Sequence, residues 1–332
     1  MKCNNYFSVA GINILVVSSK QYQINEKSDW RYQNFLLKKE PKKIDLKIDL
    51  RIKEDYVRYN PEILFETRRE KVNPKGKALC RNRLRELRMR QEINEQRKKK
   101  EDYLGSELGW RISEIGNKYL LEGGAAGNFQ AYFDKKFQKI KIDVISDKNE
   151  WKLADVFTGF LQLFLIYYLS YTKQGIVVHS TAIKDKPNKG KGYLFAGVSG
   201  AGKSTTSKIW DKNSPGVIIL NDDRIILRKI KNKFYIYSTP WHGDFSDYLK
   251  NSTEHASLDK LFFIYHKKTN KAEKVPHREF FNLFYQSLFV PFWDKENLNF
   301  VSEFMMELME KVPCYKFGFK NNKKIIEYVR NI

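Results

Sequence analysis

The octet Gly197-Val198-Ser199-Gly200-Ala201-Gly202-Lys203-Ser204 decides how the second half of this chain folds. It follows an apolar run with strand composition, Tyr193 to Ala196, and it leads into a segment from Lys203 that predicts a helix. Glycines let such a loop curl so that successive N–H groups point at an anion, and the helix N-terminus adds partial positive charge. The octet therefore predicts a phosphate-binding loop, with ATP or GTP as its ligand.

Individual residues of the loop have separate expected tasks. Lys203 is expected to reach the terminal phosphates, and the hydroxyl of Ser204 suits Mg²⁺ as a ligand. The predicted nucleotide-binding set extends one residue beyond the octet: Gly197, Ser199, Gly200, Ala201, Gly202, Lys203, Ser204 and Thr205. ATP and Mg²⁺ are the expected cofactors, with GTP and pyrophosphate left open as donors.

Length and pattern predict an α/β protein with two domains. The 332 residues are enough for about two cores. Residues 151–332 combine a helix from Asp155 to Ser170 with apolar strands at 176–179, 193–196 and 217–220, which favours an α/β sheet with nucleotide at the carboxyl ends of its strands. A hairpin at 225–238, helices from Leu258 to Met309, a strand at 315–317 and a short helix from Lys323 are expected to follow.

Residues 1–150 predict a smaller β-rich domain. The run Phe7 to Val17 has strand composition, as do 118–121, 129–133 and 140–145. Apolar and polar residues alternate from Leu46 to Ile52, the period of a half-buried strand in an antiparallel sheet with one wet face.

A basic segment at about 66–102 interrupts this domain and carries much of the net charge of +22. Fourteen Lys or Arg and four Glu lie between Arg68 and Lys100, and spaced leucines predict a helix. Such a field attracts polyanions: an acidic peptide, nucleic acid or an anionic membrane. A solvated cationic helix is the favoured interpretation of the pattern, and the lack of aromatic residues weakens the case for nucleic acid.

The remaining composition points to the cytoplasm. Three scattered cysteines, Cys3, Cys80 and Cys314, lack metal-ligand spacing, and no signal peptide is apparent. The apolar stretch from Phe157 to Tyr171 is shorter than the roughly 20 residues of a bilayer span, so a buried core helix is expected instead of a transmembrane segment. The sequence leaves open whether the chain forms a homo-oligomer.

Two adjacent carboxylates, Asp222 and Asp223, follow the third apolar strand and precede Arg224. One carboxylate can hold Mg²⁺ and the other can accept a proton from an attacking hydroxyl, which is the division of work in phosphoryl transfer. Consecutive Asp residues also occur in solvated turns. Their position after a buried strand favours a transfer or hydrolysis site.

Two further segments carry polar side chains near expected strand ends. His179 follows the strand at 176–178, where a structural histidine is the simpler interpretation. The segment from Thr239 to Asp244 contains Trp241 and His242, which fit either the wall of an acceptor pocket or a rigid turn with a buried indole.

The order of these motifs resembles the HPr kinase/phosphorylase family, and more closely the HPr-kinase-like proteins of peptide-modification systems. The resemblance rests on His179-Ser180-Thr181-Ala182, the octet, Asp222-Asp223-Arg224 and Thr239-Pro240-Trp241, and it covers about 151–332. It implies a P-loop fold related to phosphoenolpyruvate carboxykinase and phosphate transfer to a serine hydroxyl. It further implies that Lys203 holds the transferring phosphate, Ser204 and Asp223 serve Mg²⁺, Asp222 is the base and His179 stands beside that base.

This chain departs from the family pattern in two places. Thr205 stands where HPr kinases carry an acidic residue, and the family's glycine-rich C-terminal signature has no counterpart here. HPr is therefore not the expected acceptor.

The sequence thus predicts a Mg²⁺-dependent kinase that moves the γ-phosphate of ATP to a hydroxyl, with Ser of a peptide or protein as the favoured acceptor. Arg224, Trp241 and His242 are candidates for acceptor or phosphate contacts. Two alternatives remain: an ATP-binding module without catalysis whose basic N-terminal region captures an acidic peptide or nucleic acid, and a small-molecule kinase.

Overall fold

The structure is a computed structural model that describes residues 2–22, 31–68, 108–123, 128–243 and 253–332. Their contacts divide the chain into two compact units. Unit 1 comprises Met1–Cys3, Val17–Gln23 and Lys47–Phe160, and unit 2 comprises Asn4–Val16, Ile24–Leu46 and Leu161–Ile332. The units therefore interleave in sequence, and a functional boundary at residue 150 stays a prediction. Residues 69–100 of the basic segment, and Asp244, lie outside the described residues.

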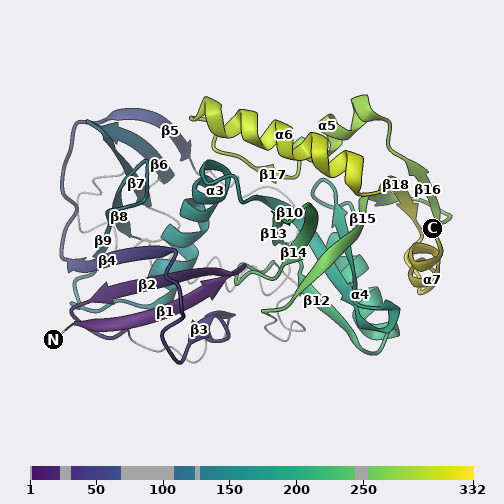
Figure 1. Cartoon of the computed structure of the whole chain (residues 1–332), viewed down its shortest axis with the longest axis horizontal. Coiled ribbons are helices and arrows are strands. Elements are labelled where there is room, and N and C mark those ends of the chain that lie inside the picture. Colours follow the sequence, from purple (N-terminus) through teal and green to yellow (C-terminus); the bar gives the residue numbers. More distant parts are fainter. Residues whose placement is uncertain (1, 23–30, 69–107, 124–127, 244–252) are drawn as a thin grey trace, which may run out of the picture. The chain divides into compact units, whose positions relative to one another are not determined.

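Unit 1 is built on strands in the order β4-β9-β8-β7-β6-β5 (Figure 1). Their bounds are β4 Leu46–Lys53, β5 Glu62–Arg68, β6 Leu108–Ile115, β7 Lys118–Gly123, β8 Phe129–Asp134 and β9 Ile140–Ile145. The predicted alternation in β4 is confirmed, because Leu46, Ile48 and Leu50 are buried between exposed residues. The sheet is not wholly antiparallel, since β4 pairs with β9 in parallel, with Ile48 opposite Ile140.

The run Phe7 to Val17 forms two strands instead of one. β1 (Cys3–Val9) and β2 (Ile12–Ser18) are separated by Ala10 and Gly11, which both have positive φ, at 53° and 75°. Two such residues suit a tight hairpin connection. β3 (Leu36–Leu37) pairs with β1. Within unit 2, a guanidinium nitrogen of Arg228 donates to the carbonyl of Ala10 at 2.5 Å, which fixes the hairpin turn to β13.

Unit 2 contains two sheet layers that share the long strands β10 (Gly175–Asp185) and β15 (His255–His266). In one layer β10 pairs with β13 (Arg224–Ile230) and β17 (Leu288–Phe289), and β14 (Lys233–Tyr237) joins β13 to β15. The strand order of the other layer is β12-β10-β11-β15-β18-β16. The bounds of its remaining strands are β11 Lys191–Ala196, β12 Val217–Asn221, β16 Lys271–Lys274 and β18 Cys314–Phe319. Among its described residues, the β11–β15 and β15–β18 pairs are parallel and the β10–β11 pair is antiparallel, so the sheet is mixed.

The helices of unit 2 are α3 (Gln162–Tyr171), α4 (Lys203–Asn213), α5 (His277–Tyr285), α6 (Lys295–Lys311) and α7 (Lys324–Asn331), with a 3₁₀ turn at Lys186–Asn188. A π-helical stretch, Asp155–Leu161, precedes α3, and together they confirm the helix predicted for 155–170. The predicted hairpin at 225–238 is confirmed as β13 and β14. In the described residues no helix is both long enough and apolar enough to cross a membrane.

Helices were wrongly predicted for the region directly after Leu258, because residues 255–266 and 271–274 form β15 and β16. The run Leu261-Phe262-Phe263-Ile264 is buried on both faces of a sheet, so it shows no alternation. A short continuous apolar run of this kind does not distinguish a central strand from a buried helix.

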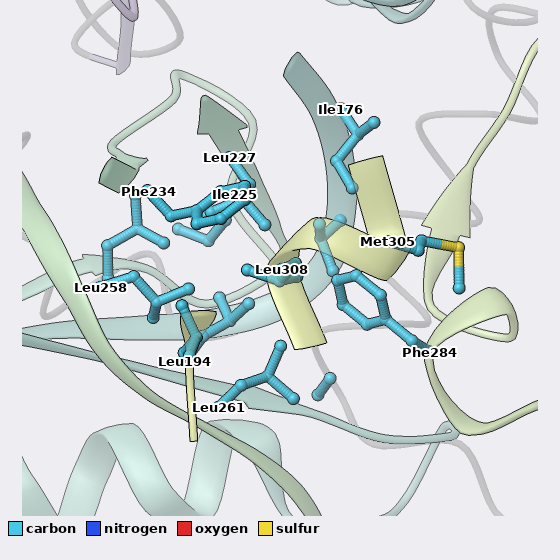
Figure 2. Close-up of a cluster of buried hydrophobic side chains, with 14 of the residues drawn as sticks. Ile176, Leu194, Ile225, Leu227, Phe234, Leu258, Leu261, Phe284, Met305 and Leu308 are labelled. Carbon is cyan, nitrogen blue, oxygen red and sulfur yellow. The ribbon is translucent and has the colours of Figure 1, made fainter. Parts of the chain in front are cut away.

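Two apolar cores lie on the two faces of the β11–β15 sheet. Leu194, Leu261 and Phe263 pack against α5 and α6, whereas Phe195 and Phe262 pack against α4 and α7. Figure 2 shows the first core, in which Phe284, Met305 and Leu308 from the helices meet side chains of the strands. The central strands are thus clamped from both faces, which fixes the edge of the sheet where β11 ends.

We expect Leu308→Ala to lower the free energy of unfolding by about 3 kcal/mol, because it leaves a cavity in this core. Leu308 is 0% exposed, and Met306 on the same helix is 45% exposed. Met306→Ala is therefore the matched control, with a loss under about 0.5 kcal/mol. Urea unfolding measures both, and equal losses for the two variants would contradict this packing.

Candidate active site

The turn from β11 into α4 leaves no space for side chains at two of its glycines. A Cβ on Gly197 would lie 3.0 Å from the carbonyl oxygen of Ile264, and one on Gly202 would lie 2.6 Å from the ring of Phe319. Gly202 also has φ of 103°, which disfavours any residue with a Cβ. The glycine-rich loop, Gly197–Gly202, therefore needs glycine at both ends, and it leads directly into the N-terminus of α4, an arrangement that favours anions.

Lys203 is the first residue of α4, and its side chain folds under the loop. Its Nζ donates to the carbonyls of Gly197, at 2.8 Å, and Val198, at 3.2 Å. Burial lowers the pKa of this ammonium group, and the negative charge of Asp223 opposes that shift. The cation is thus held at the loop with a carboxylate as its nearby counter-charge.

Asn221, at the end of β12, shapes the turn that carries the acidic pair. Its Oδ1 accepts from the backbone N–H groups of Asp223, at 2.8 Å, and Arg224, at 3.1 Å. Its Nδ2 donates to the carbonyl of Thr239 at 2.8 Å. Sequence reasoning missed this fully buried residue, although Asn before a turn is a known signal for side-chain to backbone bonds of this kind.

The two adjacent carboxylates have different surroundings. The side chain of Asp222 is 0% exposed, and its Oδ1 accepts from the N–H of Gly243 at 2.9 Å. Asp223 is 28% exposed and pairs with Nε2 of His179 at 3.1 Å and Nε of Arg224 at 3.2 Å. Burial would raise the pKa of Asp223, but the hydrogen bond from His179 and the nearby positive charges of Arg224 and Lys203 outweigh it and lower the pKa.

The position of His179 differs from the one that the family resemblance implied. His179 contacts Asp223, not Asp222. The reason lies in strand register: His179 is opposite Arg224 in the β10–β13 pair, which places the imidazole next to the carboxylate that immediately precedes Arg224. His179 therefore supports the more exposed carboxylate.

Arg224, Trp241 and His242, the three candidates for acceptor or phosphate contacts, have other surroundings than the cavity wall. Arg224 lies over the ring of Phe289, at 4.7 Å, while it faces Asp223. Trp241 is buried, and Nδ1 of His242 lies 3.1 Å from Nδ2 of Asn221. Since the amide nitrogen donates, Nδ1 is the accepting nitrogen of that imidazole. Arg224 and His242 thus contact the acidic turn, and none of the three side chains is among the described residues that line the cavity.

The loop and the acidic turn face a common cavity of about 390 Å³. This size is within the usual range for small-molecule sites. Its walls bring together His179, Ser199, Gly200, Gly202, Lys203, Ser204, Thr205, Asp222, Asp223, Gly243 and His266. Gly243 lies in the segment from Thr239 to Asp244, one predicted candidate for a pocket wall. His266 was not predicted, because β15 reaches this site through its long-range pairing with β11, which no local pattern records.

The cavity residues fit a phosphate chain with its Mg²⁺. The described residues hold no group of three or more His, Cys, Asp or Glu that would form a metal cage. Mg²⁺ does not require one, because it commonly keeps several waters and shares one or two protein oxygens with substrate phosphates. Ser204 and Asp223, which both line the cavity, are oxygen ligands of that type.

No family model and no curated protein matches this chain. Among solved structures, it is similar to one described as the Hpr(Ser) kinase/phosphatase from Coxiella burnetii, at 15% sequence identity and a TM-score of 0.27. The alignment covers 47% of this chain and 94% of that chain. The relationship is distant and leaves the chemistry of the cavity to be argued from its own residues.

The buried His242 gives this site a measurable pH dependence. Its pKa is lowered from the ordinary 6.5 to about 4, chiefly by burial and also by the charge of Arg31, while the charge of Asp223 opposes the shift. Between these two values the unfolded chain binds a proton that the folded chain does not, so this contribution to stability falls as pH falls from 6.5 towards 4.

We therefore expect the wild type to lose about 2–3 kcal/mol more unfolding free energy than His242→Gln between pH 7 and pH 4.5. Gln keeps an acceptor for Asn221 but does not titrate. Urea unfolding at both pH values measures the difference, and parallel pH profiles for the two proteins would show that His242 is protonated normally in the fold.

Proposed function

We propose that this protein is a Mg²⁺-dependent phosphotransferase that moves the γ-phosphate of ATP to a hydroxyl group, with Ser of a peptide or protein as the favoured acceptor. One observation carries the proposal: the cavity joins Lys203, which follows a glycine-rich loop, to two carboxylates in different surroundings. A loop of this kind binds the phosphates, and a carboxylate pair beside it supplies both of the remaining requirements of the transfer.

In this proposal, the loop N–H groups and Lys203 hold the phosphate chain. Ser204 and Asp223 hold Mg²⁺, which when bound neutralises charge on the phosphoryl oxygens. The lowered pKa of Asp223 suits this task, because a metal ligand must stay ionised. His179 and Arg224 keep that carboxylate charged and oriented.

Asp222 takes the role of proton acceptor. The acceptor oxygen forms a bond to the γ-phosphorus, the bond from that phosphorus to the β–γ bridging oxygen breaks, and ADP leaves with the electron pair. The hydroxyl proton passes to the Asp222 carboxylate.

The net charge of +22 favours an acidic peptide or protein as the acceptor. The basic segment that would provide much of this attraction lies outside the described residues. A transfer assay therefore has to distinguish an acidic peptide, a nucleic acid and a small molecule as the molecule that this protein acts on or binds. Assembly into a homo-oligomer is likewise left to measurement.

Asp222→Asn should reduce phosphate transfer about a thousandfold while ATP affinity changes little, because the amide keeps the Gly243 contact but cannot take the proton. Lys203→Met should weaken both ATP binding and transfer. Labelled γ-phosphate and calorimetry measure the two quantities. Asp211→Asn is the matched control, since Asp211 is an exposed carboxylate on α4.

A different outcome is that the wild type binds ATP tightly and yet transfers no labelled phosphate to any peptide, protein or small molecule. That result would favour the alternative of an ATP-binding module without catalysis. Full transfer by Asp222→Asn would remove that residue from the proton-accepting role.

Asp223→Asn should raise the Mg²⁺ concentration for half-maximal transfer at least about tenfold, because a metal ligand loses its charge. Asp222→Asn should leave this concentration unchanged. The measurement is a Mg²⁺ titration of the residual transfer rate, and the reverse pattern would exchange the roles of the two carboxylates.

A further inference from the structure

One wall of the cavity has no task in the proposed transfer. His266, the last residue of β15, lines the cavity beside Ser199 and Gly200. Its side chain is exposed, and Nε2 lies 3.2 Å from the carbonyl oxygen of Gly200. A ring nitrogen that faces a carbonyl donates its proton.

Strand order places His266 and the acidic pair on opposite sides of the loop. β11, which ends at Ala196 just before the loop, pairs with β10 on one side and with β15 on the other. His179 comes from β10, and the acidic pair follows β12, which also pairs with β10. His266 comes from β15, three residues beyond the residue that faces Ala196. The loop therefore separates two walls of the cavity. The wall that carries Asp222 and Asp223 is called the transfer wall, and the opposite wall, which carries His266, is called the β15 wall.

The direction of a bound nucleotide follows from this separation. The γ-phosphate must face the transfer wall, where Asp222 and Asp223 lie. The phosphate chain crosses the loop beside Lys203. The nucleoside, at the other end of the molecule, then extends toward the β15 side of the cavity.

His266 is held in a way that suits a flat ligand. Its ring packs against Phe319, with centroids 5.4 Å apart, and Cε1 would lie 3.0 Å from a Cβ on Gly202. Contact with Phe319 on one side and the Gly200 hydrogen bond on the edge fix the plane of the imidazole. A fixed planar ring at the mouth of a polar cavity provides a stacking surface for a base or ribose.

We propose that His266 forms the nucleoside side of the site and contacts the base or ribose of ATP, while the loop and Lys203 hold the phosphates. This inference rests on the proposed function, both in taking ATP as the ligand and in placing its γ-phosphate at Asp222 and Asp223. It assigns to the β15 wall the discrimination between a nucleotide and a bare polyphosphate.

Calorimetric titrations of the full chain with Mg²⁺-ATP and with Mg²⁺-tripolyphosphate, which has no nucleoside, test this assignment. We expect His266→Ala to weaken ATP binding about tenfold and tripolyphosphate binding less than about twofold. His266→Phe keeps a planar ring and should hold ATP within about threefold of wild type. His277→Ala changes an exposed histidine at the start of α5 and should alter neither titration.

A similar loss for ATP and tripolyphosphate in His266→Ala would overturn the assignment, because it would show that His266 only supports the loop. Unchanged ATP binding would overturn it as well. If wild type bound neither ligand, the proposed function itself would fail, an outcome distinct from the other two because it appears before any substitution.

Discussion

The backbone turn between β11 and α4 must pass close to its neighbours, and the site depends on that constraint. Gly197 lies against Ile264 of β15, and Gly202 lies against Phe319 of β18. Those strands are parallel to β11 and are clamped by helices on both faces, so the turn has little freedom to move. The peptide N–H groups and Lys203 are thereby arranged before any ligand arrives, which is how a binding loop avoids an ordering cost.

A buried polar network gives the two adjacent carboxylates different properties. Asn221 bonds to the backbone of Asp223 and Arg224 and to Thr239, so the acidic turn has a defined path. Along that path Asp222 is enclosed, whereas Asp223 faces His179 and Arg224. Of these two adjacent residues, one thus has a buried carboxylate and the other an ion-paired carboxylate. The proposed acid–base and metal-binding roles require such a difference.

Sequence reasoning reached the features that local pattern determines. The strand and helix around the octet, the hairpin of β13 and β14 and the alternation of β4 follow from residues close in the chain. It failed where distant pairing decides. β15 is buried on both faces and shows no period, and the contact of His179 with Asp223 depends on the register between β10 and β13. The place of His266 depends on β15 lying beside β11, which no local signal records.

The most direct test of the account is a comparison of AMP, ADP and ATP binding by calorimetry in the presence of Mg²⁺. If the glycine-rich loop and Lys203 hold the phosphate chain, ADP and ATP will bind at least about tenfold more tightly than AMP. AMP binding as tight as ATP binding would show that the nucleoside alone determines affinity. That result would contradict a phosphate-centred site and the transfer chemistry proposed for it.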